Sequence, residues 1–99
     1  ALTPTEIVRA HRHGAKAVKL FPASAMGPAY VKDLQGPLAH IPLVAVGGVS
    51  LDNAAAYLAA GAVGLGLGSQ LLDRQALRDG NYALITERAR QFVQAVSLR

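Results

Sequence analysis

A lysine stands inside an apolar segment of this 99-residue sequence. Lys19 lies between Val18 and Leu20, in a stretch whose residue types predict a short strand. Lysine is depleted in strands and is rarely buried without a partner. Two interpretations stay open: a side chain that extends into solvent, which the pattern alone favours, or an amine held uncharged by burial that could attack a carbonyl carbon.

Two glycine-containing turns could bind an anion. Gly47-Gly48 directly follows one apolar run, and Gly68-Ser69 follows the next. Glycine lets the backbone bend tightly and lets a ligand approach N–H groups, and an adjacent helix N-terminus favours negative charge. In barrel enzymes the loops after the last two strands frequently form a phosphate site. The two turns therefore predict a site for a phosphate group.

Other chemistries lack the residues that they need. The sequence has no cysteine, which excludes disulfides, thiolate metal sites and cysteine nucleophiles. A dinucleotide fingerprint beginning at Gly64 fails because its third glycine position falls on Ser69, and the Walker A and G-x-S-x-G patterns are absent. His11 and His13 would lie on different faces of a helix, and His40 is predicted to lie in a loop. We therefore expect no metal site and no cofactor.

Charge and hydropathy limit the partners. The net charge of +4 is dispersed along the chain, with no stripe of basic residues interleaved with aromatics, so we expect a small anionic ligand and no nucleic acid. Apolar stretches are interrupted well short of about 20 residues, so we expect no membrane span. The first residues do not resemble a signal peptide, and we expect a cytoplasmic protein.

Helices and strands alternate in the predicted order of elements. Thr3-Pro4-Thr5-Glu6 is typical of a capped helix start, and Ser50 is predicted to cap a later helix. We expect Ile85, Ala89, Phe92, Val93 and Val96 to form one apolar stripe on a last helix. The first predicted helix begins at or near residue 4 and ends at residue 14. Two further helices are predicted over 29–35, closed by Gly36-Pro37, and over 51–60. The predicted strands cover 17–21, 43–46 and 63–67.

Strict alternation of strand and helix predicts an α/β fold with parallel strands joined by right-handed crossovers. An open doubly wound sheet and part of a (β/α)₈ barrel both fit this pattern. We expect one domain over residues 1–99 and, if it is a barrel, less than half of the eight strands.

Four motifs, in order and with the right gaps, resemble the bacterial 2-keto-3-deoxy-6-phosphogluconate (KDPG) and 4-hydroxy-2-oxoglutarate aldolases. The resemblance covers essentially the whole chain. The motifs are Val18-Lys19-Leu20-Phe21-Pro22-Ala23, Gly27-Pro28 with Tyr30-Val31-Lys32, Gly47-Gly48-Val49 and Gly66-Leu67-Gly68-Ser69.

The resemblance implies a class I aldolase on a (β/α)₈ barrel, a homotrimer that needs no metal or cofactor. It implies that the chain supplies strands equivalent to the sixth to eighth and lacks the N-terminal strands. It also implies that Lys19 forms a Schiff base with the keto acid. The implied substrate and phosphate contacts are Gly47, Gly48, Gly68, Ser69, Phe21, Pro22 and Val46.

The implied substrate is a phosphorylated 2-keto acid cleaved to pyruvate and glyceraldehyde 3-phosphate. Val46 stands where many KDPG enzymes have Thr, and here the chain resembles enzymes that act on the galactonate epimer. Gly36-Pro37-Leu38 resembles the KDPG enzymes, so the gluconate compound ranks first and the galactonate compound second.

The family's general-base glutamate has no counterpart in this sequence, and neither Glu6 nor Glu87 matches it. We therefore expect the chain to be part of a longer one and to be inactive alone. Two other hypotheses remain: a phosphate-binding isomerase or synthase in which Lys19 is only a charge, or a non-catalytic partial barrel that binds phosphate or its missing half.

Overall fold

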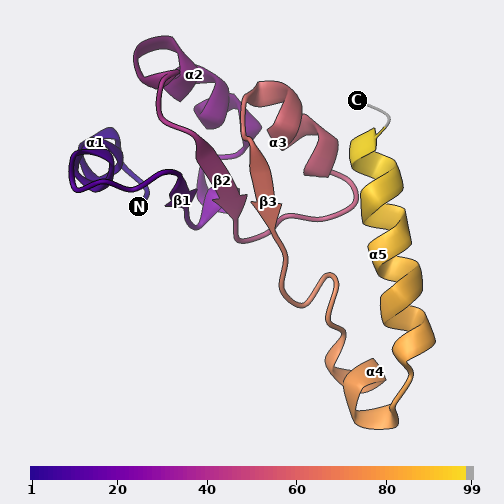
Figure 1. Ribbon diagram of the computed structural model, residues 1–99. Coiled ribbons are helices and arrows are strands. Elements are labelled where there is room, and N and C mark those ends of the chain that lie inside the picture. The colour runs from indigo at the N-terminus through magenta and orange to yellow at the C-terminus, as the bar shows by residue number, and fades with distance from the viewer. Residues whose placement is uncertain (98–99) are drawn as a thin grey trace.

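The sheet has three parallel strands in the order β1-β2-β3, as the alternation predicted. The computed structural model describes residues 1–97 (Figure 1). The strands are β1 (Val18–Leu20), β2 (Leu43–Val46) and β3 (Gly64–Gly66). β2 has the predicted bounds, and the other two are shorter by one residue at each end. Because the strands are parallel, their carboxyl ends meet at one edge of the sheet.

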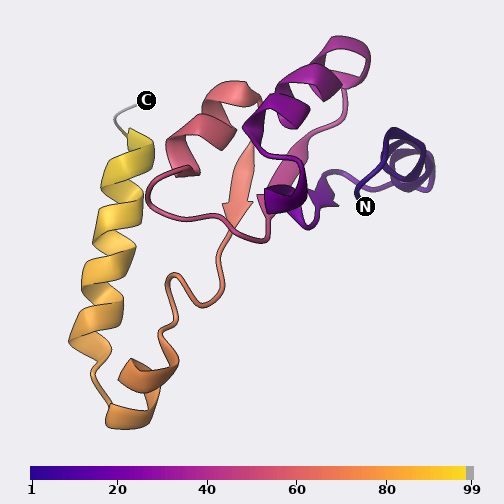
Figure 2. The ribbon, with the colours of Figure 1, turned by 180° about the vertical axis from the view of Figure 1, so that it is seen from behind.

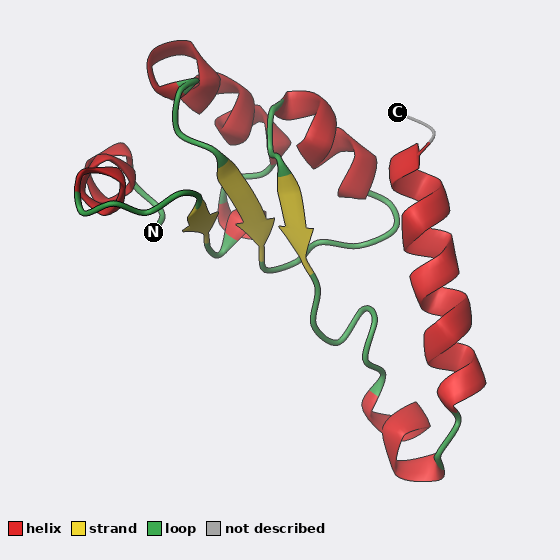
Figure 3. Ribbon diagram, viewed as in Figure 1, coloured by secondary structure: helices red, strands yellow, loops and turns green. Residues whose placement is uncertain are grey.

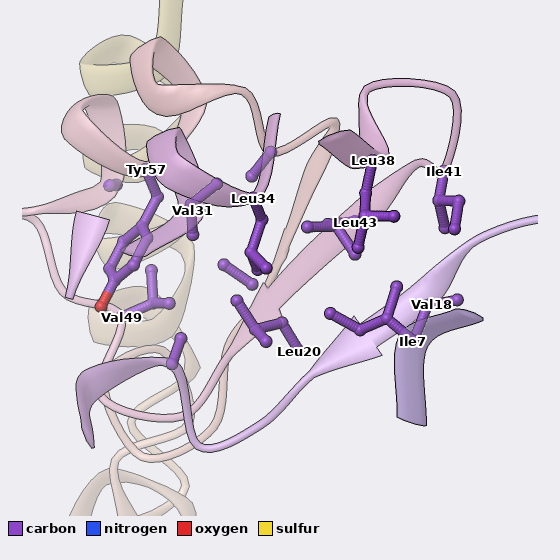
Figure 4. Packing of buried hydrophobic residues seen from close by; sticks show 14 of the residues in the cluster. Ile7, Val18, Leu20, Val31, Leu34, Leu38, Ile41, Leu43, Val49 and Tyr57 are labelled. Carbon is purple, nitrogen blue, oxygen red and sulfur yellow. The ribbon is translucent and has the colours of Figure 1, made fainter. Parts of the chain in front are cut away.

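Side chains on successive strand residues point to opposite faces of this sheet. On one face Val18, Leu20, Leu43 and Ala45 are buried. They join the core formed with α2 (Pro28–Leu38) and α3 (Ala54–Ala60), which supply Val31, Leu34, Leu38, Ala54 and Tyr57 (Figure 4). On the other face Lys19 is exposed, and Val44 and Val46 are half-buried.

The first helix, α1 (Pro4–Arg12), begins as predicted. The Glu6 amide donates to Thr3 Oγ1 at 3.3 Å, and the Thr3 amide donates to the Glu6 carboxylate at 2.9 Å. This reciprocal pair is a capping box, which satisfies two amides that the helix itself cannot. The helix ends at Arg12, two residues before the predicted Gly14, with His13 as its C-cap.

The predicted end of the second helix was wrong. We expected it to close before Gly36-Pro37, but α2 continues through both residues to Leu38. Leu34 and Leu38, one turn apart, are both buried in the core. Burial of Leu38 offsets the hydrogen bond that Pro37 cannot donate, and at the last turn of a helix only one such bond is lost.

The predicted start of the third helix was also wrong. α3 begins at Ala54 rather than Leu51, and residues 51–53 form a turn. Ser50 does not cap this helix with its side chain; its amide instead donates to Asn53 Oδ1 at 2.8 Å. The helix ends at Ala60 with Gly61 as C-cap, as predicted.

The C-terminal part of the described chain forms an arm beside the sheet. The short helix α4 (Arg74–Asp79), which the sequence did not predict, is capped by Asp73 and is followed by α5 (Tyr82–Ser97). Figures 2 and 3 show α5 lying next to α3 at one end, while α4 lies well away from the sheet. Of the predicted stripe, Phe92 is buried and Val93 is 64% exposed. α5 contacts only α3 and α4 closely, and that narrow contact leaves Val93 uncovered.

None of the described helices combines the length and apolar character that crossing a bilayer requires.

Candidate active site

The predicted functional residues gather where the three parallel strands end. Phe21-Pro22 follows β1, Gly47-Gly48 follows β2, and Gly68-Ser69 comes soon after β3. In α/β folds this carboxyl edge is the usual place for a ligand, because the connecting loops converge there.

A pocket of about 340 Å³ opens between these segments. Of the residues predicted to form the site, all except Lys19 and Pro22 line it. The lining residues are Phe21, Val46, Gly47, Gly48, Val49, Gly66, Leu67, Gly68, Ser69 and Gln70.

Lys19 lies in the middle of β1, and its amine reaches the wall of this pocket. Its Nζ lies 4.9 Å from the centroid of the Phe21 ring, within the range of a cation–π contact. The same ring lies against Gly47, where an added Cβ would come within 3.0 Å of two ring atoms. Phe21 therefore connects the amine to the turn that follows β2.

Of the two interpretations of Lys19, the described chain has the exposed side chain that the pattern alone favoured. Its side chain is exposed, because none of the described helices packs on the sheet face that carries it. In the described chain its Nζ takes part in no hydrogen bond or ion pair. The apolar neighbours Val18 and Leu20 that suggested burial point to the opposite face, into the core.

Pro22 was predicted as a pocket wall, and the structure places it differently. The Phe21–Pro22 peptide is cis. Pro22 is the N-cap of the short 3₁₀ helix η1 (Ala23–Ala25), and its carbonyl accepts from the Ala25 amide at 3.1 Å. The residue thus turns the chain into η1 and does not line the pocket.

Val46 forms the floor between two strands. It lies opposite Gly66 in the parallel register of β2 and β3. A Cβ on Gly66 would lie 2.7 Å from Val46 Cγ2, so glycine is needed there to accommodate the valine side chain. The floor is therefore apolar, and Val46 offers a bound molecule no hydrogen bond.

The turn after β2 is tightly held by its neighbours. Gly47 and Gly48 have φ of +96° and +73°, a region that favours glycine. The Ser24 amide of η1 donates to the Gly47 carbonyl at 3.1 Å, and a Cβ on Gly48 would overlap the Ser24 side chain. Asn53 Nδ2 donates to the Gly48 carbonyl at 2.9 Å.

The turn after β3 is held by its own local hydrogen bonds and by a residue far along the chain. The Gly68 carbonyl accepts from the amides of Leu71 and Leu72, at 3.0 and 2.9 Å. Arg88 of α5 donates from Nη1 to the Gln70 carbonyl at 3.0 Å. Gly68, Ser69 and Gln70 are all exposed.

Both turns present backbone amides that are not used within the described chain. In residues 1–97 the amides of Gly48, Val49, Ser69 and Gln70 donate no hydrogen bond, whereas the amides of Ser50, Leu71 and Leu72 do. In a trans peptide the C=O and the following N–H point in opposite directions. The carbonyls of Gly47, Gly48 and Gly68 are engaged by the protein, so the amides of the next residues point away from those contacts. Convergent free amides are the groups that bind an oxyanion.

The helix N-terminus expected beside Gly47-Gly48 does not adjoin the pair. α3 begins at Ala54 and has only seven residues. The intervening turn at residues 51–53 separates the glycines from the helix. Any attraction of this turn for an anion therefore comes from its own amides and not from the α3 dipole, whose effect falls off within one turn.

The two glutamates considered in the sequence are engaged elsewhere. The Glu6 carboxylate belongs to the capping box of α1, where hydrogen bonds from the Thr3 amide, the Thr3 hydroxyl and the Leu2 amide lower its pKa. Glu87 pairs with Arg90 at 3.3 Å on the surface of α5. Within residues 1–97 no three His, Asp or Glu side chains are grouped so as to hold a metal ion.

Sequence reasoning missed Ser24, Asn53, Gln70 and Arg88. Asn53 has a local signal, because Asn is frequent just before a helix, although such an Asn usually bonds forward to the helix. Arg88 has none, since it lies 18 residues from its partner Gln70. Contacts at that separation follow from how helices pack and not from local pattern.

Comparison with known proteins identifies similar chains. The family model described as KDPG and KHG aldolase matches residues 1–88. The 2-dehydro-3-deoxy-6-phosphogalactonate aldolase of Escherichia coli K12 is 49% identical over 70 residues, which are 70% of this chain and 34% of that protein. The 2-dehydro-3-deoxy-phosphogluconate aldolase of Pseudomonas aeruginosa is 37% identical over 91 residues, covering 91% of this chain and 41% of that protein.

A solved structure described as native KDPGal is similar over 95% of this chain and 48% of its own, with a TM-score of 0.73 and 40% identity. The chain thus spans less than half the length of the relatives that it matches.

Proposed function

Because the chain belongs to the KDPG and KHG aldolase family, we propose that it supplies the nucleophile and the phosphate-binding turns of a class I aldolase. One observation carries the proposal: the turns after β2 and β3 enclose a single pocket, and Phe21 in its wall contacts both Gly47 and the Lys19 amine. A nucleophile beside an anion pocket suits a substrate with a carbonyl at one end and a phosphate at the other.

Lys19 is the proposed catalytic residue. Its uncharged amine adds to the C2 carbonyl of the keto acid, and loss of water gives an iminium ion. The iminium draws electrons from the C3–C4 bond, which breaks once the C4 hydroxyl has lost its proton. Glyceraldehyde 3-phosphate leaves, the enamine takes up a proton at C3, and hydrolysis releases pyruvate and the free lysine.

The phosphate is proposed to bind the amides of Gly48, Val49, Ser69 and Gln70, next to Gly47 and Gly68. Fixing the phosphate fixes the distance from Lys19 at which the reacting carbonyl lies, which is how binding energy is converted into orientation. The unengaged amides of the two turns support this role.

Trapping of the imine tests the lysine. In the full-length protein, pyruvate and borohydride should leave a reduced pyruvate adduct on Lys19, located by peptide mass spectrometry. Lys19→Arg keeps the charge and should abolish the adduct, with kcat/KM lower by at least about a thousandfold. Lys16→Arg, three residues away on the exposed surface, is the matched control. A full-length protein without an adduct would remove the aldolase assignment and favour a phosphate-binding isomerase or synthase.

The proton shuttle is proposed to come from outside these 99 residues. Glu6 and Glu87 are engaged in the capping box and the Arg90 pair, and neither lines the pocket. Residues 1–99 alone should therefore turn over very slowly. A rate for this chain alone of roughly 1–1000 per second would contradict that expectation.

We propose that β1, β2 and β3 are equivalent to the sixth to eighth strands of a (β/α)₈ barrel. The exposed sheet face that carries Lys19 would be the barrel interior, where a closed barrel supplies the apolar surroundings that the described chain lacks. The complete protein is proposed to be a cytoplasmic homotrimer. A non-catalytic partial barrel that binds only phosphate is the alternative, and it predicts phosphate binding without an adduct on Lys19.

The gluconate and galactonate compounds are the two candidate substrates, and Val46 is the pocket residue that bears on the choice between them. Gly36-Pro37-Leu38, which ranked the gluconate compound first, lies on α2 and outside the pocket, whereas Val46 lines it. An aliphatic side chain there cannot hydrogen-bond a sugar hydroxyl. Together with the 49% identical phosphogalactonate aldolase, this favours the galactonate compound, with the gluconate compound second. The ratio of kcat/KM for the two compounds tests the order, and Val46→Thr should shift it toward gluconate.

A further inference from the structure

The side chain of Asn53 is oriented away from the helix that it precedes. Asn53 is the N-cap of α3, and an asparagine at such a position normally accepts a hydrogen bond from an amide in the first helical turn. Here the side chain makes no such bond. Its Oδ1 accepts from the Ser50 amide at 2.8 Å, and its Nδ2 donates to the Gly48 carbonyl at 2.9 Å. The amide group thus spans the turn after β2.

The bond from Asn53 to Gly48 determines the direction of another group. The Gly48 carbonyl and the Val49 N–H belong to one planar peptide, so fixing the carbonyl fixes the N–H on the opposite side. The Ser24 amide fixes the preceding peptide in the same way, through the Gly47 carbonyl. The two amides proposed to bind phosphate in this turn are therefore each oriented by one contact behind them.

Only the Asn53 contact can be removed by a side-chain substitution. Ser24 uses its backbone amide, which every residue except proline retains. Asn53 uses its side chain, and the glycine on which it acts has a φ of +73°. Without the restraint, a glycine peptide has many accessible orientations, so the N–H is no longer held in one direction.

We propose that Asn53 is a positioning residue that sets the affinity of this pocket for a phosphate group by fixing the peptide between Gly48 and Val49. The proposal rests on the proposed function, because it deepens the phosphate site of that function. Asn53 does not touch the ligand; it acts through the backbone of the turn.

Three variants of the full-length protein test it. Asn53→Ala removes both hydrogen bonds. Asn53→Asp keeps the acceptor for Ser50 and removes the donor to Gly48, except where the carboxyl is protonated and can donate again. Asn81→Ala is the matched control. Asn81 also lies just before a helix, and its side chain accepts from the Leu84 amide at 3.3 Å, but it does not line the pocket.

The first measurement is the dissociation constant for inorganic phosphate, from the shifts of the Val49 and Gly48 amide signals in NMR spectra. Asn53→Ala should weaken binding by about ten- to thirtyfold, the effect of losing one well-oriented donor to a charged group. Asn81→Ala should change it by less than about twofold, the scale of a substitution outside the site. Because this readout needs no turnover, it remains valid even if Lys19 forms no imine.

The second measurement separates positioning from general destabilisation. With glyceraldehyde 3-phosphate and pyruvate, Asn53→Ala should raise the aldehyde KM by about the same ten- to thirtyfold and leave kcat within about threefold. With unphosphorylated glyceraldehyde, KM should not change. The phosphate affinity of Asn53→Asp, relative to wild type at each pH, should improve as the pH falls from about 7 to about 5, because protonation restores the donor.

Phosphate affinity of Asn53→Ala within about twofold of wild type, in a variant whose melting shows a native fold, would overturn the proposal. Equal rises of KM for both aldehydes would overturn it as well, since they indicate a structural role alone. Failure of imine trapping with intact phosphate binding would instead refute only the lysine chemistry.

Discussion

The two turns that enclose the pocket are built in different ways. The turn after β2 is short and braced by its immediate surroundings: Ser24 lies against Gly48, Asn53 spans the turn, and the buried residue Val49 anchors its far side. The turn after β3 is exposed, and its contact from outside comes from Arg88, on a helix 18 residues later.

This difference predicts a rigid first turn and a more adjustable second turn. Val49 and Tyr57 of α3 are both in the core, and Figure 4 shows the Tyr57 hydroxyl pointing toward Val49. The first turn is thereby continuous with the core and should have one conformation with or without a ligand. The second turn is held by an exposed hydrogen bond and should adjust more easily, because such a bond contributes little against the entropy of the loop.

The largest expected effect comes from removing the support beneath the first turn. Tyr57 is 1% exposed and is the largest of the fully buried side chains. Tyr57→Ala should lower the free energy of unfolding by about 3–5 kcal/mol, the usual cost of deleting a buried aromatic ring. Tyr57→Phe, which keeps the ring, should cost less than about 1.5 kcal/mol. Denaturant unfolding measures both, and a comparable loss for the two variants would show that the hydroxyl and not the ring supports the turn.

Alanine substitutions at Gly48 and Gly68 compare the two turns directly. At Gly48, alanine would have to adopt a φ of +73°, and its Cβ would overlap the Ser24 side chain. At Gly68, an added Cβ has no atom within 4 Å, and the backbone φ is not positive. We expect Gly48→Ala to cost about 2–4 kcal/mol from strain and overlap, and to weaken phosphate binding by at least about tenfold. Gly68→Ala should change phosphate binding by less than about threefold. Equal losses, measured by calorimetric titration with inorganic phosphate, would contradict the distinction between the turns.

Arg88 gives a smaller effect. Arg88→Ala removes the bond to the Gln70 carbonyl, and we expect phosphate affinity to fall by about three- to fivefold, more at low salt than at high salt. Arg90→Ala is the control, because Arg90 is on the same helix and, within residues 1–97, pairs only with the exposed Glu87. A loss for Arg88→Ala as large as that for Asn53→Ala would mean that the second turn is as firmly fixed as the first.

The smallest effect is expected for Glu6→Gln at the start of α1, and this variant is the reference for the others. The Thr3 amide, the Thr3 hydroxyl and the Leu2 amide lower the pKa of Glu6 below its ordinary value near 4.5. A carboxyl whose pKa is lower in the folded state stabilises the fold above its ordinary pKa, and this contribution is lost as the pH falls through the folded-state value. Glu6→Gln should slightly lower the melting temperature at neutral pH and reduce its fall on acidification. Phosphate affinity should not change; a change would show that α1 is coupled to the pocket.

Much of the secondary structure could be predicted because its signals are local. The capping box of Thr3 and Glu6, the bounds of β2 and the end of α3 at Gly61 depend on a few neighbouring residues. The errors arose where burial outweighed a local signal, as in α2, which continues through Gly36 and Pro37 because Leu38 reaches the core. α4 has its Asp73 cap and its C-terminal Gly80, but it is short and carries little apolar periodicity.

For the candidate site, the sequence by itself determined which residue types stand at the ends of the strands. Once the strands are parallel, their turns must meet at one edge, so Phe21, Val46, Gly47, Gly48, Gly68 and Ser69 line one pocket. Only the tertiary structure decided that Lys19 points away from the core, that Asn53 spans its turn and that Arg88 reaches Gln70. The physical reason is that the direction of a side chain or a peptide plane depends on contacts between segments distant in the chain, whereas the order of strands and turns follows from local pattern.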